Sequence, residues 1–515
     1  MTGGAARQGG AGVSVRMGAV RALLLLAVLP APLLAAPLPP VRAAAVLYVT
    51  DAHEISPVVD RQGDRGGVAR LKTVVDRQKA ESPGALLVFG GDLAGGTLFG
   101  GVFRGAPMVG ALGRAGVGLA TFGQHDFDFG AEHARGLVTR SAFPWITSNL
   151  VDREGRPFAS LPTRKVVRVG ALSVGFIGLT DDFDSTTPEG LVLARDLASS
   201  AAREEKALRA EGAEAVIALT QAGFDANRRL LEAVPGIDAV LTEEESETVS
   251  VVRWVGGSPV AAPCGNLGSV VELVLEKRGG SVVARVTAHP VDGSVPPDPA
   301  LAREEAEWTA RLEKELAAPA GALASALELE GSVVRETALG DLVADAFRAA
   351  TGADVALVPG SGLRASLPAG ALTRRHAMAV LPFGNRVVTV EMSGSALGAA
   401  LSRGLDGAGR RSGSLFQVSG LSYAGDLAAP EGKRLGEVLV AGAPLRGDAT
   451  YRVAVSSFVA GGGDGNREAA AGKRLPVPGG EPLDADALAE HLARLSRSGP
   501  AASSASDRIR LDGRR

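Results

Sequence analysis

The most informative stretch of this chain is Gly123-Gln124-His125-Asp126-Phe127-Asp128-Phe129-Gly130. It follows residues 117–122, an apolar run that predicts a buried strand. The flanking glycines allow the sharp turns that such a loop needs. His125 and Asp128 stand three residues apart, and a carboxylate at that reach can fix the tautomer of an imidazole and raise its basicity. The pair therefore suits a proton donor or an electrostatic clamp.

Two earlier apolar runs are also followed by acidic or imidazole side chains. Residues 45–50 lead into Asp51-Ala52-His53, and residues 85–90 lead into Gly91-Asp92. Successive strand ends converge at one edge of a sheet, which is where α/β folds usually place their sites. We therefore expect acidic and imidazole groups to meet at this edge.

Composition narrows the class of protein. The chain has 515 residues, enough for two domains, with 46% hydrophobic and 22% charged residues, as in ordinary globular proteins. A net charge of −3 predicts no binding to nucleic acid polymers, and no obligate protein partner is evident. The single cysteine, Cys264, leaves neither a disulfide nor a lipoprotein anchor available.

The N-terminus resembles an export signal. Arg16 and Arg21 precede an apolar run at residues 22–36, and a small-residue cleavage site follows at residues 41–45. The run is short and contains two prolines, so it does not suit a membrane span. We predict a signal peptide over residues 1–43, a periplasmic or extracellular protein, and no membrane attachment after cleavage. A signal anchor or a wrong start codon, with translation from Met17, is the alternative.

Strand and helix signals alternate along the mature chain, which predicts a layered α/β architecture. Strands are expected at residues 143–148, 171–179, 215–219 and 237–241, and helices at 67–79 and 196–211. Pro-Pro-Asp-Pro at 296–299 marks a boundary before an amphipathic helix at 301–318. We predict a first domain over 44–295, a linker helix within 296–330, a second domain over 331–495, and a tail over 496–515. Its Ser/Ala/Gly/Pro-rich part, residues 496–506, is expected to be mobile.

The ordered motifs resemble a known family. Asp-x-His, then Gly-Asp, then Gly-Asn-His-Glu is the signature of calcineurin-like metallophosphoesterases, and Phe-Asp-Phe-Gly resembles their bacterial 5'-nucleotidase branch. Four later stretches resemble the C-terminal half of 5'-nucleotidases: residues 335–346, 359–364, 381–385 (Leu-Pro-Phe-Gly-Asn) and 458–465. The resemblance implies a four-layer α/β/β/α metallophosphoesterase sandwich followed by a C-terminal α/β substrate domain.

The resemblance also implies a metal centre for one or two divalent ions. Its ligands would be Asp51, His53, Asp92, Gln124, Gln221, Glu245 and Glu247, with Asp92 bridging two metals and Gln124 in place of an asparagine. Such a centre generates hydroxide that attacks phosphorus. His125 and Asp128 would steady the phosphoryl oxygens or the leaving group. Carboxylate and amide ligands favour Mn²⁺, Mg²⁺ or Ca²⁺ over Zn²⁺.

The metal shell departs from the family pattern at two further places. The chain has Thr220-Gln221-Ala222-Gly223 where the family has Ser-His-x-Gly. It has Glu244-Glu245-Ser246-Glu247 where the family has Gly-His-Ser-His or Gly-His-Ser-Gln. Either the ligands have been exchanged for harder ones, or the glutamates form a solvated acidic loop on a domain that has lost its second metal.

The second domain supplies the expected substrate contacts. Phe458 and Asp464 flank a glycine-rich turn, and family members use an aromatic residue there to stack a base. Phe416 is the expected second ring, although it is displaced by one position. Arg364 would pair with phosphate oxygens. These residues predict a small-molecule nucleotide or another phosphoester as the substrate.

The predicted function is exported, metal-dependent hydrolysis of a nucleoside monophosphate or related phosphoester. Two alternatives remain open. One is a nucleotide- or metabolite-binding protein on the same scaffold, without turnover. The other is a hydrolase of 2',3'-cyclic nucleotides or of sulfur esters.

Overall fold

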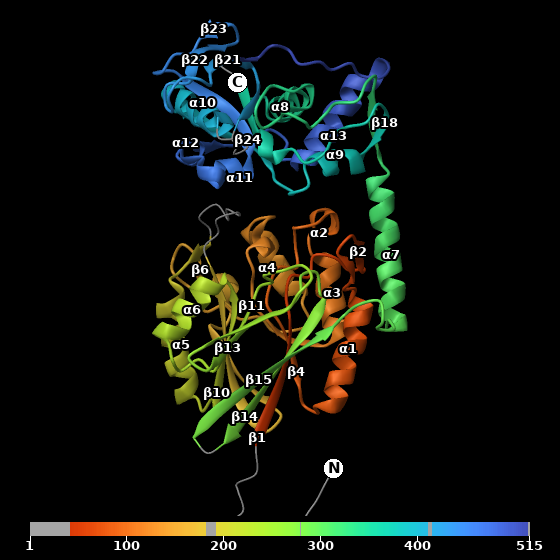
Figure 1. Ribbon diagram of the computed structural model, residues 1–515, viewed down its shortest axis with the longest axis vertical. Helices are drawn as coiled ribbons and strands as arrows, with labels where there is room; N and C mark the ends of the chain where they lie inside the picture. Colours follow the sequence, from red (N-terminus) through yellow and green to blue (C-terminus); the bar gives the residue numbers. More distant parts are fainter. Residues whose placement is uncertain (1–41, 182–191, 279, 410–414, 513–515) are drawn as a thin grey trace, which may run out of the picture. The chain divides into compact units, whose positions relative to one another are not determined.

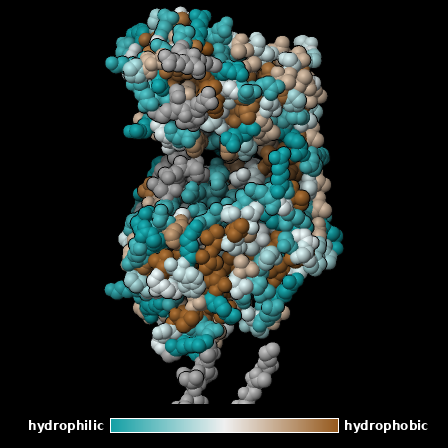
Figure 2. All heavy atoms as spheres, viewed as in Figure 1, coloured by the Kyte–Doolittle hydropathy of each residue, from teal (hydrophilic) through white to brown (hydrophobic). Residues whose placement is uncertain are grey.

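The computed structural model describes residues 42–181, 192–278, 280–409 and 415–512. Residues from 41 onward cluster as one unit. The predicted signal peptide lies outside the described residues except for its last two positions. Within the described ranges no helix combines the length and apolar character needed to cross a membrane. On the face shown in Figure 2, hydrophilic side chains interrupt the apolar patches.

The first half of the chain contains two stacked β-sheets (Figure 1). One has the order β15-β14-β1-β4-β5, and its central strands β1, β4 and β5 are parallel. Its strands are β1 (Arg42–Val49), β4 (Leu86–Phe89), β5 (Val117–Ala120), β14 (Ser269–Arg278) and β15 (Ser281–Pro290). The parallel strands are short apolar runs, as expected for strands covered on both faces. The sheet directs the C-terminal ends of these three strands to one edge.

The second sheet has the order β12-β13-β11-β10-β8-β7. Its strands are β7 (Arg164–Val169), β8 (Leu172–Thr180), β10 (Ala215–Gln221), β11 (Ala239–Thr242), β12 (Val251–Val255) and β13 (Ser258–Ala262). Strands β8, β10 and β11 are parallel, so β10 and β11 also end at a common edge. Gln221 closes β10 there.

Helices cover the outer face of each sheet, and a buried apolar core fills the space between the sheets. Tyr48, Phe176 and Ile217 belong to that central core. The first sheet is covered by α1 (Val68–Glu81), α3 (Ala106–Ala115) and α4 (Ala131–Arg140), and the second by α5 (Leu197–Ala210) and α6 (Phe224–Ala233). The predicted four-layer α/β/β/α sandwich is confirmed.

One expected strand is missing. Residues 143–148 form only an isolated bridge between Trp145 and Ala120. Pro144 lacks a backbone N–H and cannot complete a ladder. The apolar character of this run instead serves an aromatic cluster, in which the Trp145 ring lies 4.8 Å from that of Phe122.

The connecting helix is α7 (Pro299–Leu316), close to the expected position. Asp298 caps it by accepting hydrogen bonds from the N–H groups of Ala300 and Leu301, and Pro299 occupies the first turn, where no N–H is needed. Its Glu305 carboxylate accepts from the Ala69 N–H at 2.7 Å. The helix is thus fixed to α1 by a buried hydrogen bond.

The second half is built on a five-stranded sheet of order β20-β17-β24-β19-β25. Its strands are β17 (Val355–Pro359), β19 (Val387–Ser393), β20 (Phe416–Ser419), β24 (Thr450–Ser456) and β25 (Lys473–Leu475). Helices α8 (Ala338–Thr351), α9 (Arg374–Val380) and α13 (Asp484–Leu495) share one apolar core, and α10 (Gly394–Gly409) contributes to another. Short helices α11 (Ser457–Ala460) and α12 (Arg467–Ala470) follow β24. A hairpin of β16 (Pro319–Leu323) and β18 (Gly370–Thr373) completes this half.

The last described residues, which follow the stretch expected to be mobile (residues 496–506), pair with the second half of the chain. Residues 509–512 form β26 (Ile509–Asp512), which pairs in parallel with β21 (Leu421–Asp426) in a small sheet with β22 (Leu435–Val440) and β23 (Ala443–Pro444). The Glu336 carboxylate accepts from the N–H groups of Ser506, Arg508 and Ile509. Arg508 also pairs with Asp345 at 2.9 Å.

Removal of residues 506–515 should therefore destabilise the protein. The deletion takes away β26 and deprives the half-buried Asp345 and Glu336 carboxylates of these partners, so we expect Tm to fall by about 5 °C or more. Differential scanning calorimetry of the purified chain measures the shift. Deleting only residues 513–515 is the control and should leave Tm unchanged. An unchanged Tm for the longer deletion would contradict a stabilising role for these contacts.

Candidate metal centre and substrate pocket

Three predicted ligands meet at the edge of the first sheet. One ligand atom from each of Asp51, His53 and Asp92 lies within 4.8 Å of the others, and all three residues are buried. Asp51 and Asp92 follow β1 and β4 and have left-handed φ values of 53° and 63°. The two loops are joined by hydrogen bonds from the Asp51 N–H to the Gly91 carbonyl (3.0 Å) and from the Ala52 N–H to the Asp92 carbonyl (2.8 Å).

A fully buried carboxylate, Asp126, ties the third loop to the second. Its Oδ2 accepts from the N–H groups of Asp92 (3.1 Å) and Gly123 (2.9 Å), and its Oδ1 accepts from Leu93 (3.0 Å). In return the His125 N–H donates to Asp92 Oδ1 at 2.7 Å. The sequence prediction missed Asp126, although it lies inside the motif at residues 123–130 and an acid next to a predicted site was a usable signal.

His125 and Asp128 form the expected pair, with Nδ1 and Oδ2 3.0 Å apart. Burial opposes the charged imidazole, but the hydrogen bond to Asp128 and the charges of Asp128, Asp92 and Asp126 raise the pKa of His125 to about 10. The His53 ring stands edge-on to that of His125, at 5.4 Å between centroids. Burial and the neighbouring His125 lower the pKa of His53 to about 3, so His53 is neutral. A neutral imidazole is the form that binds metals.

The charge balance around these residues favours a bound cation. Burial raises the pKa of Asp51 well above its ordinary value, and Glu244 and Asp92 add to the effect. Burial likewise raises the pKa of Asp92, opposed by His125 and reinforced by Asp126 and Asp128. His53 Nδ1 and Gln221 Oε1 are buried without a hydrogen-bond partner. The His53 ring turns Nε2 toward Asp51, at 4.0 Å from Oδ1. The donor set therefore fits a divalent ion, because a cation would relieve the repulsion and give Gln221 Oε1 a partner.

The two predicted glutamine ligands, Gln221 and Gln124, differ in how deeply they are buried beside the Asp51, His53 and Asp92 group. Gln221 is fully buried, and its Nε2 donates to Thr50 Oγ1 (2.8 Å) and to the Gly90 carbonyl (3.3 Å), which leaves Oε1 as the available ligand atom. Gln124 is half-buried and precedes the short 3₁₀ turn His125–Phe127. Both hold positions next to the Asp51, His53 and Asp92 loops.

The structure does not bring Glu245 and Glu247 to this group. Glu245 is exposed and forms an ion pair with Arg253. Glu247 contacts Arg65 at 3.3 Å and Asn266 Nδ2 at 3.1 Å. The prediction that these two carboxylates replace imidazole ligands is therefore wrong. Arg253 on β12 pairs with Glu245, and Arg65 on the short strand β3 (Gly63–Arg65) pairs with Glu247.

The preceding residues of the same loop face the site instead. The Glu244 N–H donates to Asp51 Oδ2 at 3.3 Å. Burial, Glu244 and Asp181 raise the pKa of Glu243 to about 7, and His125 is among the charges that act on it. The sequence analysis recognised the acidic run but chose the wrong members, because which carboxylates turn inward depends on arginines outside that run.

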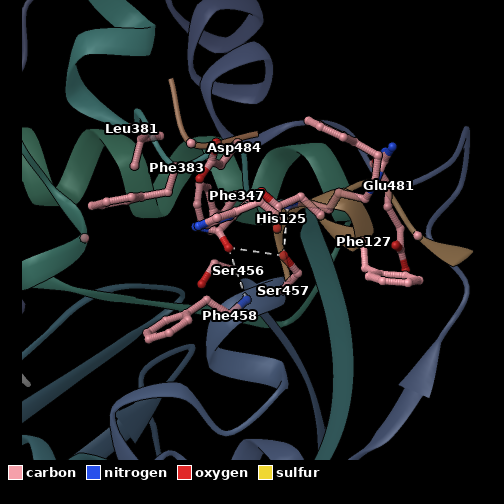
Figure 3. A pocket seen from close by; sticks show the side chains of 18 of the residues that line it. His125, Phe127, Phe347, Leu381, Phe383, Ser456, Ser457, Phe458, Glu481 and Asp484 are labelled. Carbon is pink, nitrogen blue, oxygen red and sulfur yellow. Dashed lines mark hydrogen bonds and ion pairs between the residues drawn. The ribbon is translucent and has the colours of Figure 1, made fainter. Parts of the chain in front are cut away.

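A pocket of about 770 Å³ adjoins the His125–Asp128 pair (Figure 3). Predicted substrate residues Phe458 and Asp464 line it together with His125 and Asp128. Arg364 is exposed and lies beside it, with its guanidinium 5.8 Å from the centroid of the lining residue Phe383.

Phe416 is placed elsewhere. It lies on β20, is 1% exposed, and packs in the apolar core formed with α10 rather than in the pocket. Period-two alternation along β20 explains the difference, because the one-residue displacement noted in the sequence turns this ring to the opposite face. The prediction of Phe416 as a base-stacking ring is therefore corrected.

Comparisons with known proteins agree with this arrangement. Residues 316–471 match the family model described as "5'-nucleotidase, C-terminal domain". The 5'-nucleotidase of Homo sapiens is 25% identical over 490 residues, which cover 82% of this chain and 83% of that protein. A 5'-nucleotidase precursor from Thermus thermophilus has 26% identity and a TM-score of 0.65, covering 92% of this chain and 100% of the other. A putative 5'-nucleotidase from Staphylococcus aureus, at 17% identity and a TM-score of 0.73 over 91% of this chain and 100% of its own, shares the fold.

Replacing Gly123 with alanine should disrupt the centre. A Cβ at this position would lie 2.0 Å from Asp92 Oδ1, so Asp92 must move. We expect Mn²⁺ binding, measured by titration calorimetry, to weaken at least about tenfold. Gly223→Ala is the matched control, because a Cβ there meets nothing within 4 Å, and it should bind Mn²⁺ as the parent does. Equal affinities for the two variants would contradict the placement of Asp92.

Proposed function

We propose that this chain is an exported, metal-dependent hydrolase that releases phosphate from nucleoside monophosphates, as its similarity to 5'-nucleotidases supports. The observation that carries the proposal is the Asp51, His53 and Asp92 group beside the His125–Asp128 pair, at a pocket that Phe458 also lines.

The metal centre would be held by Asp51, His53 and Asp92, with Gln221 Oε1 and Gln124 as amide ligands. A divalent cation bound there would neutralise charge on the phosphoryl group and activate water. Oxygen donors outnumber nitrogen donors in this set, so Mn²⁺, Mg²⁺ or Ca²⁺ is favoured over Zn²⁺. Glu243 and Glu244 add negative charge at the same edge, which further favours a bound cation over a bare site.

His125 would act on the phosphoryl group from beside the metal ligands. The hydrogen bond to Asp128 raises the pKa of His125 and so favours the protonated imidazole. Asp128 accepts from Nδ1 and so leaves Nε2–H to face the substrate. The cationic ring would pair with a phosphoryl oxygen and could donate its proton to the leaving 5'-oxygen.

The second domain would hold the nucleoside. Phe458 offers an aromatic face and Asp464 a carboxylate for ribose hydroxyls, and both line the pocket that reaches His125. Arg364 is the candidate anion contact at its side. A small phosphoester is therefore the proposed substrate, and residues 1–43 support export as the route to the periplasm or the medium.

One observation favours a second candidate, a nucleotide-binding protein without turnover. Glu245 and Glu247 are paired with arginines, so each of the two expected metal positions lacks one of its expected ligands. A hydrolase releases phosphate and loses this activity when a chelator removes the metal. A binding protein binds the nucleotide without releasing phosphate, and a chelator does not affect the binding.

The mature protein should release phosphate from AMP in the presence of Mn²⁺ and lose this activity with EDTA. Asp92→Asn should lower kcat/KM by about 100-fold or more, because it removes a carboxylate from the metal group. Glu245→Gln is the control and should retain activity, because Glu245 pairs with Arg253 at the surface. A colorimetric phosphate assay measures both. An inactive parent with bound Mn²⁺ would favour the binding protein.

Substitution of the imidazole separates chemistry from binding. We expect His125→Asn to lower kcat about 10²- to 10⁴-fold with little change in KM, because the proton donor and cation are lost. Asp128→Asn should have a smaller effect in the same direction, since the ring remains but loses its partner. Steady-state kinetics with AMP give the two parameters. A pure KM effect would place His125 in substrate binding alone.

A further inference from the structure

The short turn that carries Asp464 has an uncommon backbone conformation. Gly462, Asp464 and Gly465 have left-handed φ values of 94°, 53° and 73° within four residues. A left-handed φ is uncommon for a residue with a Cβ, although aspartate adopts it more readily than most, and it persists where the surrounding structure imposes it. Asp464 is exposed and lines the pocket. The turn must therefore be held by contacts from outside itself.

Asn466 closes this turn from its C-terminal side. The residue is 2% exposed, and its Nδ2 donates to the Gly463 carbonyl at 2.5 Å. Its main-chain N–H donates to the carbonyls of Gly462 (3.1 Å) and Gly463 (3.2 Å). A side-chain amide that bonds nearby backbone groups in this way stabilises a turn in place of regular secondary structure. The conformation of Asp464 therefore depends on the orientation of the Asn466 amide.

Arg403 on α10 fixes that amide. Its Nη2 donates to Asn466 Oδ1, and its Nε and Nη2 donate to Glu468 Oε2 at 3.2 Å and 3.1 Å. The Arg403 and Glu468 side chains are only 24% and 22% exposed, so water screens this pair less than a pair on the open surface. Helices α10 and α12 lie side by side (Figure 1). One guanidinium thus connects α10, the start of α12 and the turn.

We propose that Arg403 and Asn466 are positioning residues that aim the Asp464 carboxylate at the two neighbouring hydroxyl groups of a bound sugar. Neither residue is among those that line the pocket, so both act through Asp464. The inference rests on the proposed function and deepens it, because it names residues outside the pocket that select ribose over sugars without these hydroxyls.

The chemistry of a carboxylate explains why the turn must be held accurately. Its two oxygens can accept hydrogen bonds from two adjacent O–H groups at once. Such bonds weaken steeply when distance or angle is poor, so a polar contact of this kind needs supporting residues that fix it within about 0.5 Å. A rotation of the backbone at Asp464 would move both oxygens together. Loss of the Arg403 contacts should therefore affect recognition of the sugar hydroxyls and leave other ligand contacts in place.

The test compares adenosine with 2',3'-dideoxyadenosine, which lacks both sugar hydroxyls. We expect Arg403→Ala to weaken adenosine binding about three- to tenfold and to leave dideoxyadenosine binding unchanged, because only adenosine can donate to Asp464. Titration calorimetry on the full mature chain, in EDTA, gives both affinities without requiring turnover. Equal losses for the two ligands would reveal a general disturbance of the pocket and would overturn the inference.

Arg452→Ala is the matched control. Arg452 also lies in the second half and pairs with a carboxylate, Asp354, at 2.8 Å, and neither residue lines the pocket. This variant should bind both ligands as the parent does, and a selective loss of adenosine like that of Arg403→Ala would contradict the inference. Arg403→Lys keeps a cation near Glu468 but not the planar fork, so it should recover part of the adenosine affinity.

A double-mutant cycle tests whether Arg403 acts through Asp464. Asp464→Asn keeps a side chain that tolerates a left-handed φ and removes the charge. We expect the double variant Arg403→Ala/Asp464→Asn to bind adenosine no more weakly than Asp464→Asn alone. Additive losses would mean that Arg403 reaches the ligand by another route, which would overturn its positioning role.

The outcomes distinguish this inference from the proposed function. If AMP releases no phosphate but Arg403→Ala selectively weakens adenosine binding, the positioning role stands and the hydrolase fails. If AMP is hydrolysed while Arg403→Ala binds adenosine like the parent, the hydrolase stands and the positioning role fails. A parent that binds adenosine no better than dideoxyadenosine would also overturn the inference.

Discussion

The site depends on one buried carboxylate. Asp126 accepts three backbone N–H groups from Asp92, Leu93 and Gly123, which belong to loops that follow two different strands. Without that acceptor these N–H groups would be buried and unpaired, at a cost of about 1–3 kcal/mol each. The hydrogen bonds fix where the Asp92 and His125 side chains leave the backbone, so the geometry of the metal group and of the His125–Asp128 pair follows from them.

The same arrangement concentrates negative charge. Asp51, Asp92, Asp126 and Asp128 are gathered around a single protonated imidazole, with Glu243 and Glu244 nearby. Such a cluster is costly in a medium of low dielectric constant unless a cation shares it. Electrostatics and the unpaired Oε1 of Gln221 thus lead to one conclusion about what the site binds. The substrate half differs, because apolar rings, among them Phe383 and Phe458, line the pocket there.

Sequence patterns predicted the layers well because they are local. The apolar runs that became β1, β4, β5, β8, β10 and β11 are short and bounded by turn residues, and the helices carry a regular apolar face. The strand predicted at residues 143–148 is absent, because an apolar run does not reveal whether its backbone pairs with a neighbouring strand. Strand β26 could not be predicted from its own residues, because it is specified by contacts with Glu336 and β21, which lie far away in the chain.

The order of the strand-end motifs can be read from the amino-acid sequence. It implies that Asp51, His53, Asp92, His125 and Asp128 meet, since parallel strands deliver their ends to one edge. Folding in three dimensions selects which carboxylates of the 243–247 loop turn inward and which phenylalanine faces the pocket. Those choices are made by side chains from other elements: Arg253 and Arg65 for the glutamates, the α10 core for Phe416, and Asn385 for Phe458. Contacts between distant residues form only in the folded chain, so no local pattern records them.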